Sequence, residues 1–175
     1  MPFLSYTQTF DNNLLLLLLR DNKRYRPIVE FFDNMTQNLS EVSWAEAELI
    51  AAEISKANRS EFCNGIRGGV SRALSAEPSM LLSDKLSTLL RFTLKVNLDP
   101  GLIKQADIDK VLSKGWSEQT VEDVVGLVAI QALYNTIATG LGFASLPEET
   151  FDQIAQDTIN SGGYLAAFNR FVESQ

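Results

Sequence analysis

The 175-residue sequence contains no histidine and a single cysteine, Cys63. Without histidine there is no imidazole for a Ser-His-Asp triad, a Cys-His dyad, a histidine-bound metal or a proton shuttle. One cysteine excludes an intrachain disulfide and a zinc site built from several cysteines. A Ser-x-x-Lys motif and a glycine-rich phosphate loop are missing as well. We therefore expect no metal and no cofactor.

The charge balance and the short apolar runs exclude further classes of function. The net charge of −7 disfavours contact with phosphate backbones, so we expect no nucleic-acid partner. The run Leu14–Leu19 has six leucines, whereas a membrane span needs about 20 apolar residues. Asp11 precedes this run and no basic segment opens the chain, so a signal peptide is not expected. We predict a cytoplasmic protein without a membrane partner, and an oligomer interface is one alternative use of the leucine run.

The apolar residues follow a helical period almost throughout, and Val, Ile and Thr form no alternating runs. We therefore predict one all-α domain over residues 1–175. Ser43 and Glu46 have the spacing of a capping box, Asn58 or Ser60 is expected to cap the next helix, and Pro27 is placed in a first turn. The predicted helices span 12–20, 26–38, 43–57, 60–74, 80–96, 107–113, 117–139, 147–161 and 164–172. The core-facing stripe predicted for helix 117–139 is Val121, Val124, Val125, Val128 and Ile137.

One segment carries a recognisable spacing of chemically useful residues. Glu48 is followed twelve positions later by Ser60, then by Cys63 and by Arg67. This segment resembles the core of the alkylhydroperoxidase-like family, which includes the carboxymuconolactone decarboxylases. The family core has a glutamate, then Cys-x-x-Cys, then a histidine at these positions. Ser60 therefore stands where the family has its first cysteine, and Arg67 stands where it has histidine.

A second block supports the same resemblance. Asp107-Ile108, Gly115-Trp116-Ser117 and the run from Asn135 to Gly142 are similar to the C-terminal half of the family's peroxidase-related branch. The likeness covers about residues 27–143, with further helices over 147–173. It implies an alkylhydroperoxidase-like helical bundle that assembles as a homo-oligomer, either a dimer, a trimer or a hexamer.

The resemblance implies a redox function, and the two departures limit it. In family members with the full motif, the second cysteine attacks a hydroperoxide, the first cysteine resolves it, and glutamate and histidine pass protons. Our first hypothesis is a peroxidase-related antioxidant oxidoreductase that works through Cys63 alone, with an external thiol as reductant. In it Glu48 delivers a proton, Arg67 stabilises the thiolate and Ser60 donates a hydrogen bond. It requires an accessible thiol with a lowered pKa.

Two other hypotheses remain at this stage. A catalytically degenerate relative would act as an oligomeric binding module, with Cys63 as inert core and with Glu48 and Arg67, if buried, joined as an ion pair. Decarboxylase or isomerase chemistry on a lactone would depend on Glu48 alone. The three glycines 65, 68 and 69 fit either close helix packing or space for a ligand beside Cys63.

Overall fold

The computed structural model describes residues 3–5, 13–75 and 83–174, and within them the chain is helical with no strand. The start of the helix predicted at Met80 lies outside these residues. The α-helices of the described residues are α1 (Asn13–Arg20), α2 (Asn22–Gln37), α3 (Trp44–Ala57), α4 (Glu61–Leu74), α5 (Asp84–Leu98), α6 (Gln105–Leu112), α7 (Glu118–Gly140), α8 (Glu148–Ser161) and α9 (Tyr164–Glu173). A short 3₁₀ helix at Pro100–Leu102 lies between α5 and α6. The all-α prediction is confirmed.

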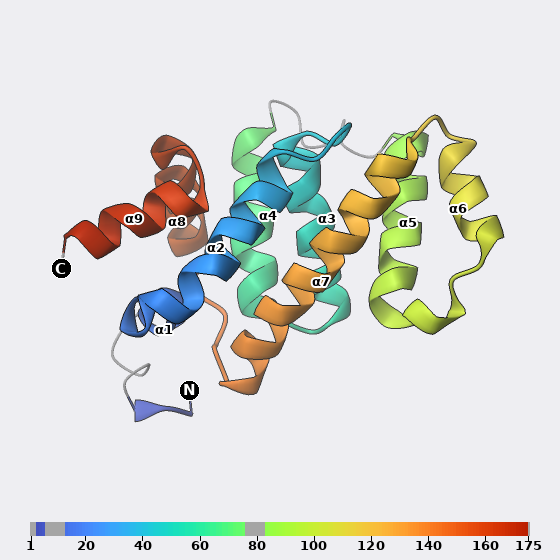
Figure 1. The fold of residues 1–175 in the computed structure, drawn as a ribbon. Coiled ribbons are helices and arrows are strands. Elements are labelled where there is room, and N and C mark those ends of the chain that lie inside the picture. The colour runs from blue at the N-terminus through green and yellow to red at the C-terminus, as the bar shows by residue number, and fades with distance from the viewer. Residues whose placement is uncertain (1–2, 6–12, 76–82, 175) are drawn as a thin grey trace.

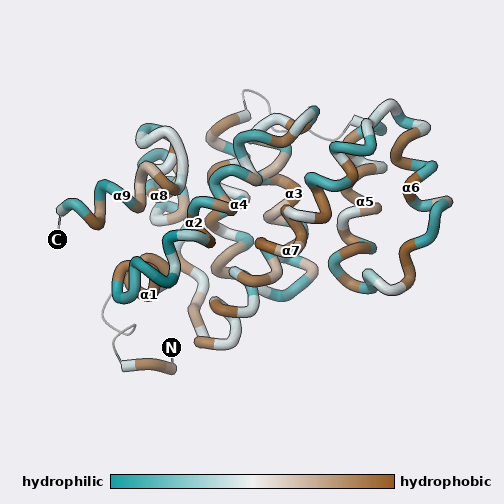
Figure 2. The backbone as a smooth tube through the Cα atoms, in the orientation of Figure 1, coloured by the Kyte–Doolittle hydropathy of each residue, from teal (hydrophilic) through white to brown (hydrophobic). Residues whose placement is uncertain are grey.

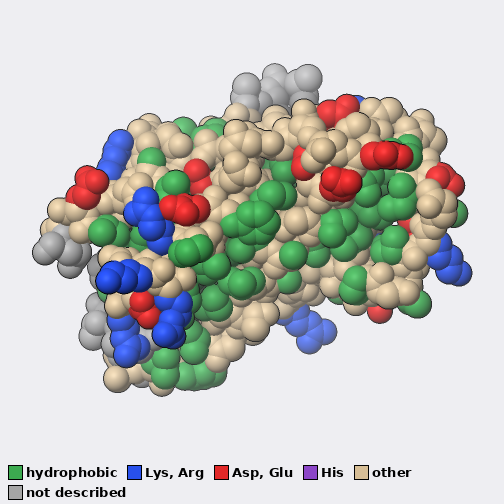
Figure 3. Space-filling model, viewed as in Figure 1, with side chains coloured by type: hydrophobic (Ala, Val, Ile, Leu, Met, Phe, Trp, Pro, Cys, Tyr) green, Lys and Arg blue, Asp and Glu red, His purple; other side chains and the backbone are tan. Residues whose placement is uncertain are grey.

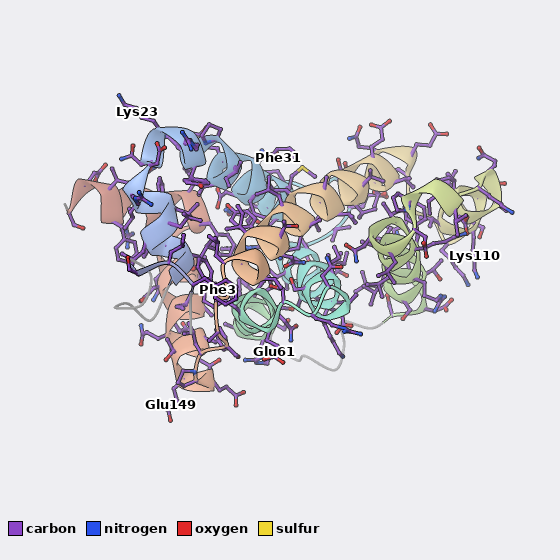
Figure 4. The ribbon with its side chains drawn as sticks, turned by 90° about the horizontal axis from the view of Figure 1, so that it is seen from below. Phe3, Lys23, Phe31, Glu61, Lys110 and Glu149 are labelled. Atoms are coloured by element: carbon purple, nitrogen blue, oxygen red, sulfur yellow. The ribbon has the colours of Figure 1, made fainter. Side chains whose placement is uncertain are left out.

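The pair α3–α4 forms the centre of the bundle (Figure 1). The connection between these helices is only residues 58–60, so they pack as an antiparallel hairpin. Helices α2 and α7 cover one side of the pair, as the view from below also shows (Figure 4). Helices α5 and α6 lie at one end of the molecule, and α8 and α9 lie at the other.

Local signals place the ends of these helices. Ser43 and Glu46 form the predicted capping box, in which each side chain bonds the other residue's backbone N–H. Ser60 is the N-cap of α4, which puts Cys63 in the first turn as predicted, but the Ser60 side chain makes no capping hydrogen bond. The placement of Pro27 in a first turn is wrong, because Asp21 caps α2 four residues earlier than expected and leaves Pro27 inside the helix.

The leucine run packs within the chain. Leu14, Leu17 and Leu18 are buried, and the intervening leucines are half-buried. Helix α1 contacts α2 and α9. A helix that is apolar on all sides needs cover, and here neighbouring helices of the same chain provide most of it.

By length and composition alone, helix α7 could cross a membrane. However, 50% of its most apolar 18-residue stretch is buried inside the structure. It lies among α2, α3 and α5 as a core helix does. Val121, Val124 and Val128 face the core as predicted, whereas Val125 is 42% exposed, so its placement in the core stripe is wrong. Figure 2 shows hydrophobic residues recurring along α7 while much of α2 is hydrophilic.

Two of the three glycines of α4 allow α8 to approach closely. A Cβ atom at Gly65 would overlap the ring of Phe151, and one at Gly69 would lie 3.2 Å from the Phe151 carbonyl oxygen. Gly68 faces only the end of Arg72, at 3.4 Å. Of the two explanations for these glycines, close helix packing is the one that the structure supports at Gly65 and Gly69.

Candidate functional site: a buried glutamate, arginine and cysteine

The four residues predicted from the sequence come together on the α3–α4 hairpin. Glu48 lies in the second turn of α3, Ser60 is the N-cap of α4, and Cys63 and Arg67 follow one turn apart on α4. All four are at most 3% exposed. Arg67 is close enough to both Glu48 and Cys63 to influence their protonation. Ionisable groups this deeply buried and mutually coupled are typical of functional sites.

Glu48 is held by two hydrogen bonds from aromatic side chains. Trp44 Nε1 donates to Oε1 at 3.2 Å, and the Tyr164 hydroxyl donates to Oε2 at 3.0 Å. Burial raises the pKa of Glu48 to about 7, and the Arg67 charge and these two hydrogen bonds offset only part of that effect. Glu48 therefore changes its charge near neutral pH.

Arg67 lies among aromatic rings rather than against a carboxylate. Its guanidinium carbon is 3.8 Å from the centre of the Phe32 ring, 4.4 Å from that of Tyr164 and 5.6 Å from that of Tyr134. Cation–π contacts of this kind partly compensate a buried charge. Nε and Nη1 have no hydrogen-bond partner among the described residues.

We expected Glu48 and Arg67 to form an ion pair if both were buried, and this prediction is wrong, because the two side chains make no salt bridge. Both are buried and both are described, yet no salt bridge joins them. The hydrogen bonds that Glu48 accepts come instead from Trp44 and Tyr164. The pair interacts only through its longer-range electrostatic attraction, which lowers the pKa of Glu48 without cancelling the effect of burial.

Cys63 is a buried free thiol that is 2% exposed. Burial raises its pKa, and the Ser60 hydroxyl and the Arg67 charge offset this only in part. The Ser60 hydroxyl oxygen is near the thiol but makes no hydrogen bond of normal geometry to any described residue. The lowered pKa and the access that peroxide chemistry requires are thus both lacking in this conformation.

Sequence reasoning missed the aromatic residues of this site. Trp44, Phe32, Tyr134 and Tyr164 are not linked to Glu48 or Arg67 by the sequence-based predictions. The spacing of Trp44 and Glu48 at i and i+4 on one helix is a signal that could have linked them. Phe32, Tyr134 and Tyr164 come from α2, α7 and α9, and no local pattern indicates that these helices meet.

These observations define a helical protein whose buried centre combines a carboxyl group, a guanidinium and a single thiol. Throughout the described ranges, no group of three or more His, Cys, Asp or Glu side chains is placed to hold a metal ion. No protein-family model matches the sequence, and a comparison with curated proteins finds no match.

Solved structures do share the fold. A peroxidase-related protein from Silicibacter sp. TM1040 superimposes with a TM-score of 0.71 over 80% of this chain and 78% of its own, at 20% sequence identity. A peroxidase-related protein from Ralstonia eutropha JMP134, described as an alkylhydroperoxidase AhpD core, gives a TM-score of 0.69 over 81% of this chain and 79% of its own, at 18% identity. The chain therefore has the alkylhydroperoxidase-like fold that the Glu48–Arg67 segment predicted.

Proposed function

We propose that this chain is a small-molecule binding protein built on the peroxidase-related fold, and that it does not run a thiol peroxidase cycle. The observation that carries the proposal is the state of Cys63, which is 2% exposed and has its pKa raised by burial. A thiol becomes a useful nucleophile only as the thiolate, and burial in apolar surroundings opposes that form.

The dithiol cycle is also chemically incomplete here. A thiolate that attacks a hydroperoxide takes one oxygen, becomes a sulfenic acid and releases an alcohol. In the full family motif a neighbouring cysteine then condenses with the sulfenic acid and releases water. Ser60 occupies that position, and a hydroxyl cannot form the disulfide.

The rest of the centre suits ligand binding. Arg67 has two nitrogens without a hydrogen-bond partner among the described residues, lies against aromatic rings and borders a pocket. A buried charge without a paired opposite charge destabilises the folded state. A bound anion would remove part of this cost, so the site favours an anionic ligand. We propose that Arg67 serves this binding role, while Glu48, which accepts hydrogen bonds from Trp44 and Tyr164, lies behind the pocket lining.

A one-cysteine antioxidant oxidoreductase is the second candidate, and one observation favours it. The Ser60 hydroxyl and the Arg67 charge both act to lower the pKa of Cys63, although burial outweighs them. In this scheme the sulfenic acid on Cys63 would be reduced by two equivalents of an external thiol, which yield one disulfide and water. A local opening of α4 would have to expose the sulfur first.

The deciding experiment measures the reactivity of Cys63 in the folded protein. Native protein is incubated with iodoacetamide from pH 6 to 9.5, with and without cumene hydroperoxide, and followed by intact mass. We expect no alkylation and no added oxygen on the native chain, and complete alkylation after denaturation in guanidinium. Rapid native alkylation together with a peroxide-dependent mass gain of one oxygen would overturn the proposal and establish the oxidoreductase.

A further inference from the structure

A pocket of about 240 Å³ lies beside Arg67, between the α1–α2 segment and helices α8 and α9. It is larger than the cavity of about 150 Å³ that takes up benzene in an apolar protein core. Its walls are mostly hydrophobic, and the buried part of them includes Leu14, Leu18, Val29, Phe32, Ile66 and Phe168. Such walls favour an alkyl chain.

The polar groups of the pocket are few and unevenly placed. Among the described residues that line it, Arg67 is the only cation; its side chain is 3% exposed, and its Nε and Nη1 have no hydrogen-bond partner there. Thr158 is already bonded to the Ile154 carbonyl. Asp157, the acidic residue among the described lining, is exposed and accepts a hydrogen bond from Gln153. The pocket is thus positive at depth and apolar along its walls.

Among the described residues, no carboxylate forms a salt bridge with Arg67, and its Nε and Nη1 have no hydrogen-bond partner. Glu48 uses its two oxygens to accept hydrogen bonds from Trp44 and Tyr164, and Phe32 and Tyr164 cover Arg67 with ring faces, which cannot accept its in-plane N–H groups as a carboxylate does. An incoming anion would gain charge-assisted hydrogen bonds in a place shielded from water, where they are strong.

We propose that this pocket binds a medium-chain aliphatic monocarboxylate, whose carboxylate accepts hydrogen bonds from Arg67 while its alkyl chain lies among the leucine and phenylalanine side chains. The inference rests on the proposed binding function and names its ligand class. The single positive charge of the Arg67 guanidinium can pair with the single negative charge of one carboxylate. The exposed Asp157 disfavours a second negative charge at the outer end, which argues against dicarboxylates.

The test titrates the full chain with octanoate and with octan-1-ol by isothermal calorimetry, so that chain length is constant and only the charge differs. We expect octanoate to bind at least about tenfold more tightly than octan-1-ol, since hydrogen bonds to a charged group are worth that much or more. Arg67→Met should weaken octanoate binding by about tenfold or more. The matched control Arg72→Met removes an exposed arginine of the same helix, paired with Asp152, and should leave binding unchanged.

A second variant keeps the test decisive if Arg67→Met fails to fold. Ala167→Phe narrows the pocket from α9 with Arg67 intact, and we expect it to abolish octanoate binding while helicity by circular dichroism is retained. Absence of octanoate binding, equal binding of acid and alcohol, or full binding by Arg67→Met would each overturn the ligand class. Those results leave the alkylation experiment on Cys63 untouched, so a wrong ligand class and a wrong function are distinguishable.

Discussion

Tyr164 and Glu48 are separated by 116 positions in the sequence and are joined by a hydrogen bond of 3.0 Å from the tyrosine hydroxyl to Oε2 of the carboxyl group. Tyr164 is the first residue of α9, and Glu48 lies in the second turn of α3. The same tyrosine ring lies 4.4 Å from the guanidinium carbon of Arg67. The C-terminal helix therefore completes the buried centre with one side chain that contacts both of its charged groups.

The variant Tyr164→Phe separates these two contacts, because it removes the hydroxyl and keeps the ring over Arg67. The hydroxyl stabilises the charged form of Glu48, so its loss should raise the pKa of Glu48 above about 7. We expect a destabilisation of about 1–2 kcal/mol at pH 8, where Glu48 is charged, and a smaller one at pH 5. Urea unfolding at the two pH values measures the difference.

Tyr25→Phe serves as the control for this variant, because it removes a tyrosine hydroxyl from α2, away from Glu48. Its effect should be the same at pH 5 and pH 8. An equal loss of stability at both pH values in Tyr164→Phe would show that the hydroxyl does not act through the charge of Glu48.

Glu48→Gln tests the raised pKa of Glu48 itself. A carboxyl group whose pKa rises from 4.5 to about 7 on folding binds more protons in the folded state between those values, so the stability of the wild-type protein should fall as pH rises through this window. The full shift corresponds to about 3 kcal/mol. Glutamine cannot ionise, so the variant should lose this pH dependence and become more stable than the wild type above pH 8.

Chemical denaturation from pH 4 to 9 measures both curves, and Glu122→Gln, an exposed change on α7, provides the control. The control should retain the wild-type slope. A Glu48→Gln curve parallel to that of the wild type would mean that Glu48 is not the group responsible.

Much of this architecture follows from local chemistry that the sequence displays. The capping box of Ser43 and Glu46 and the position of Cys63 in a first turn depend on residues at most a few positions apart. The predicted helices over 43–57 and 60–74 carry Glu48, Cys63 and Arg67, and the short connection between the observed helices makes them an antiparallel hairpin.

The environment of these residues was not predictable in the same way. The neighbours of Glu48 and Arg67 include Tyr164 and Phe32, which come from helices distant in sequence. The accessibility of Cys63 depends on how the neighbouring helices close over it. Both are properties of tertiary packing, and no periodicity within one helix encodes them.

Gly65→Ala tests the close packing of α4 on α8. The added methyl group would overlap the ring of Phe151, and overpacking of this kind costs about 1–3 kcal/mol, more than the helix propensity that alanine gains. Gly68→Ala is the matched control, because its nearest neighbour is the movable end of Arg72 at 3.4 Å, and we expect it to be neutral or stabilising by up to about 1 kcal/mol.

Thermal unfolding of the two variants gives the comparison directly. The double variant Gly65→Ala with Phe151→Leu, which shortens the opposing side chain, should recover part of the lost stability. If Gly65→Ala were as stable as Gly68→Ala, the α4–α8 contact would be looser than the structure describes.

The last prediction concerns assembly, which the sequence resemblance implied. Phe31 on α2 and Val125 and Leu133 on α7 are 46%, 42% and 38% exposed, and Figure 3 shows hydrophobic side chains gathered on the face over these two helices. Apolar groups that cluster on one face favour association between copies of the chain. We expect the wild-type protein to sediment as a homo-oligomer and Phe31→Asp to sediment as a monomer at the same concentration, because a charge in a desolvated contact is costly.

Leu98→Asp places the same charge on an exposed leucine at the end of α5, outside this face, and should leave the oligomer intact. A monomeric wild-type protein would refute the assembly, and dissociation by Leu98→Asp alone would move the interface to the α5 end of the molecule.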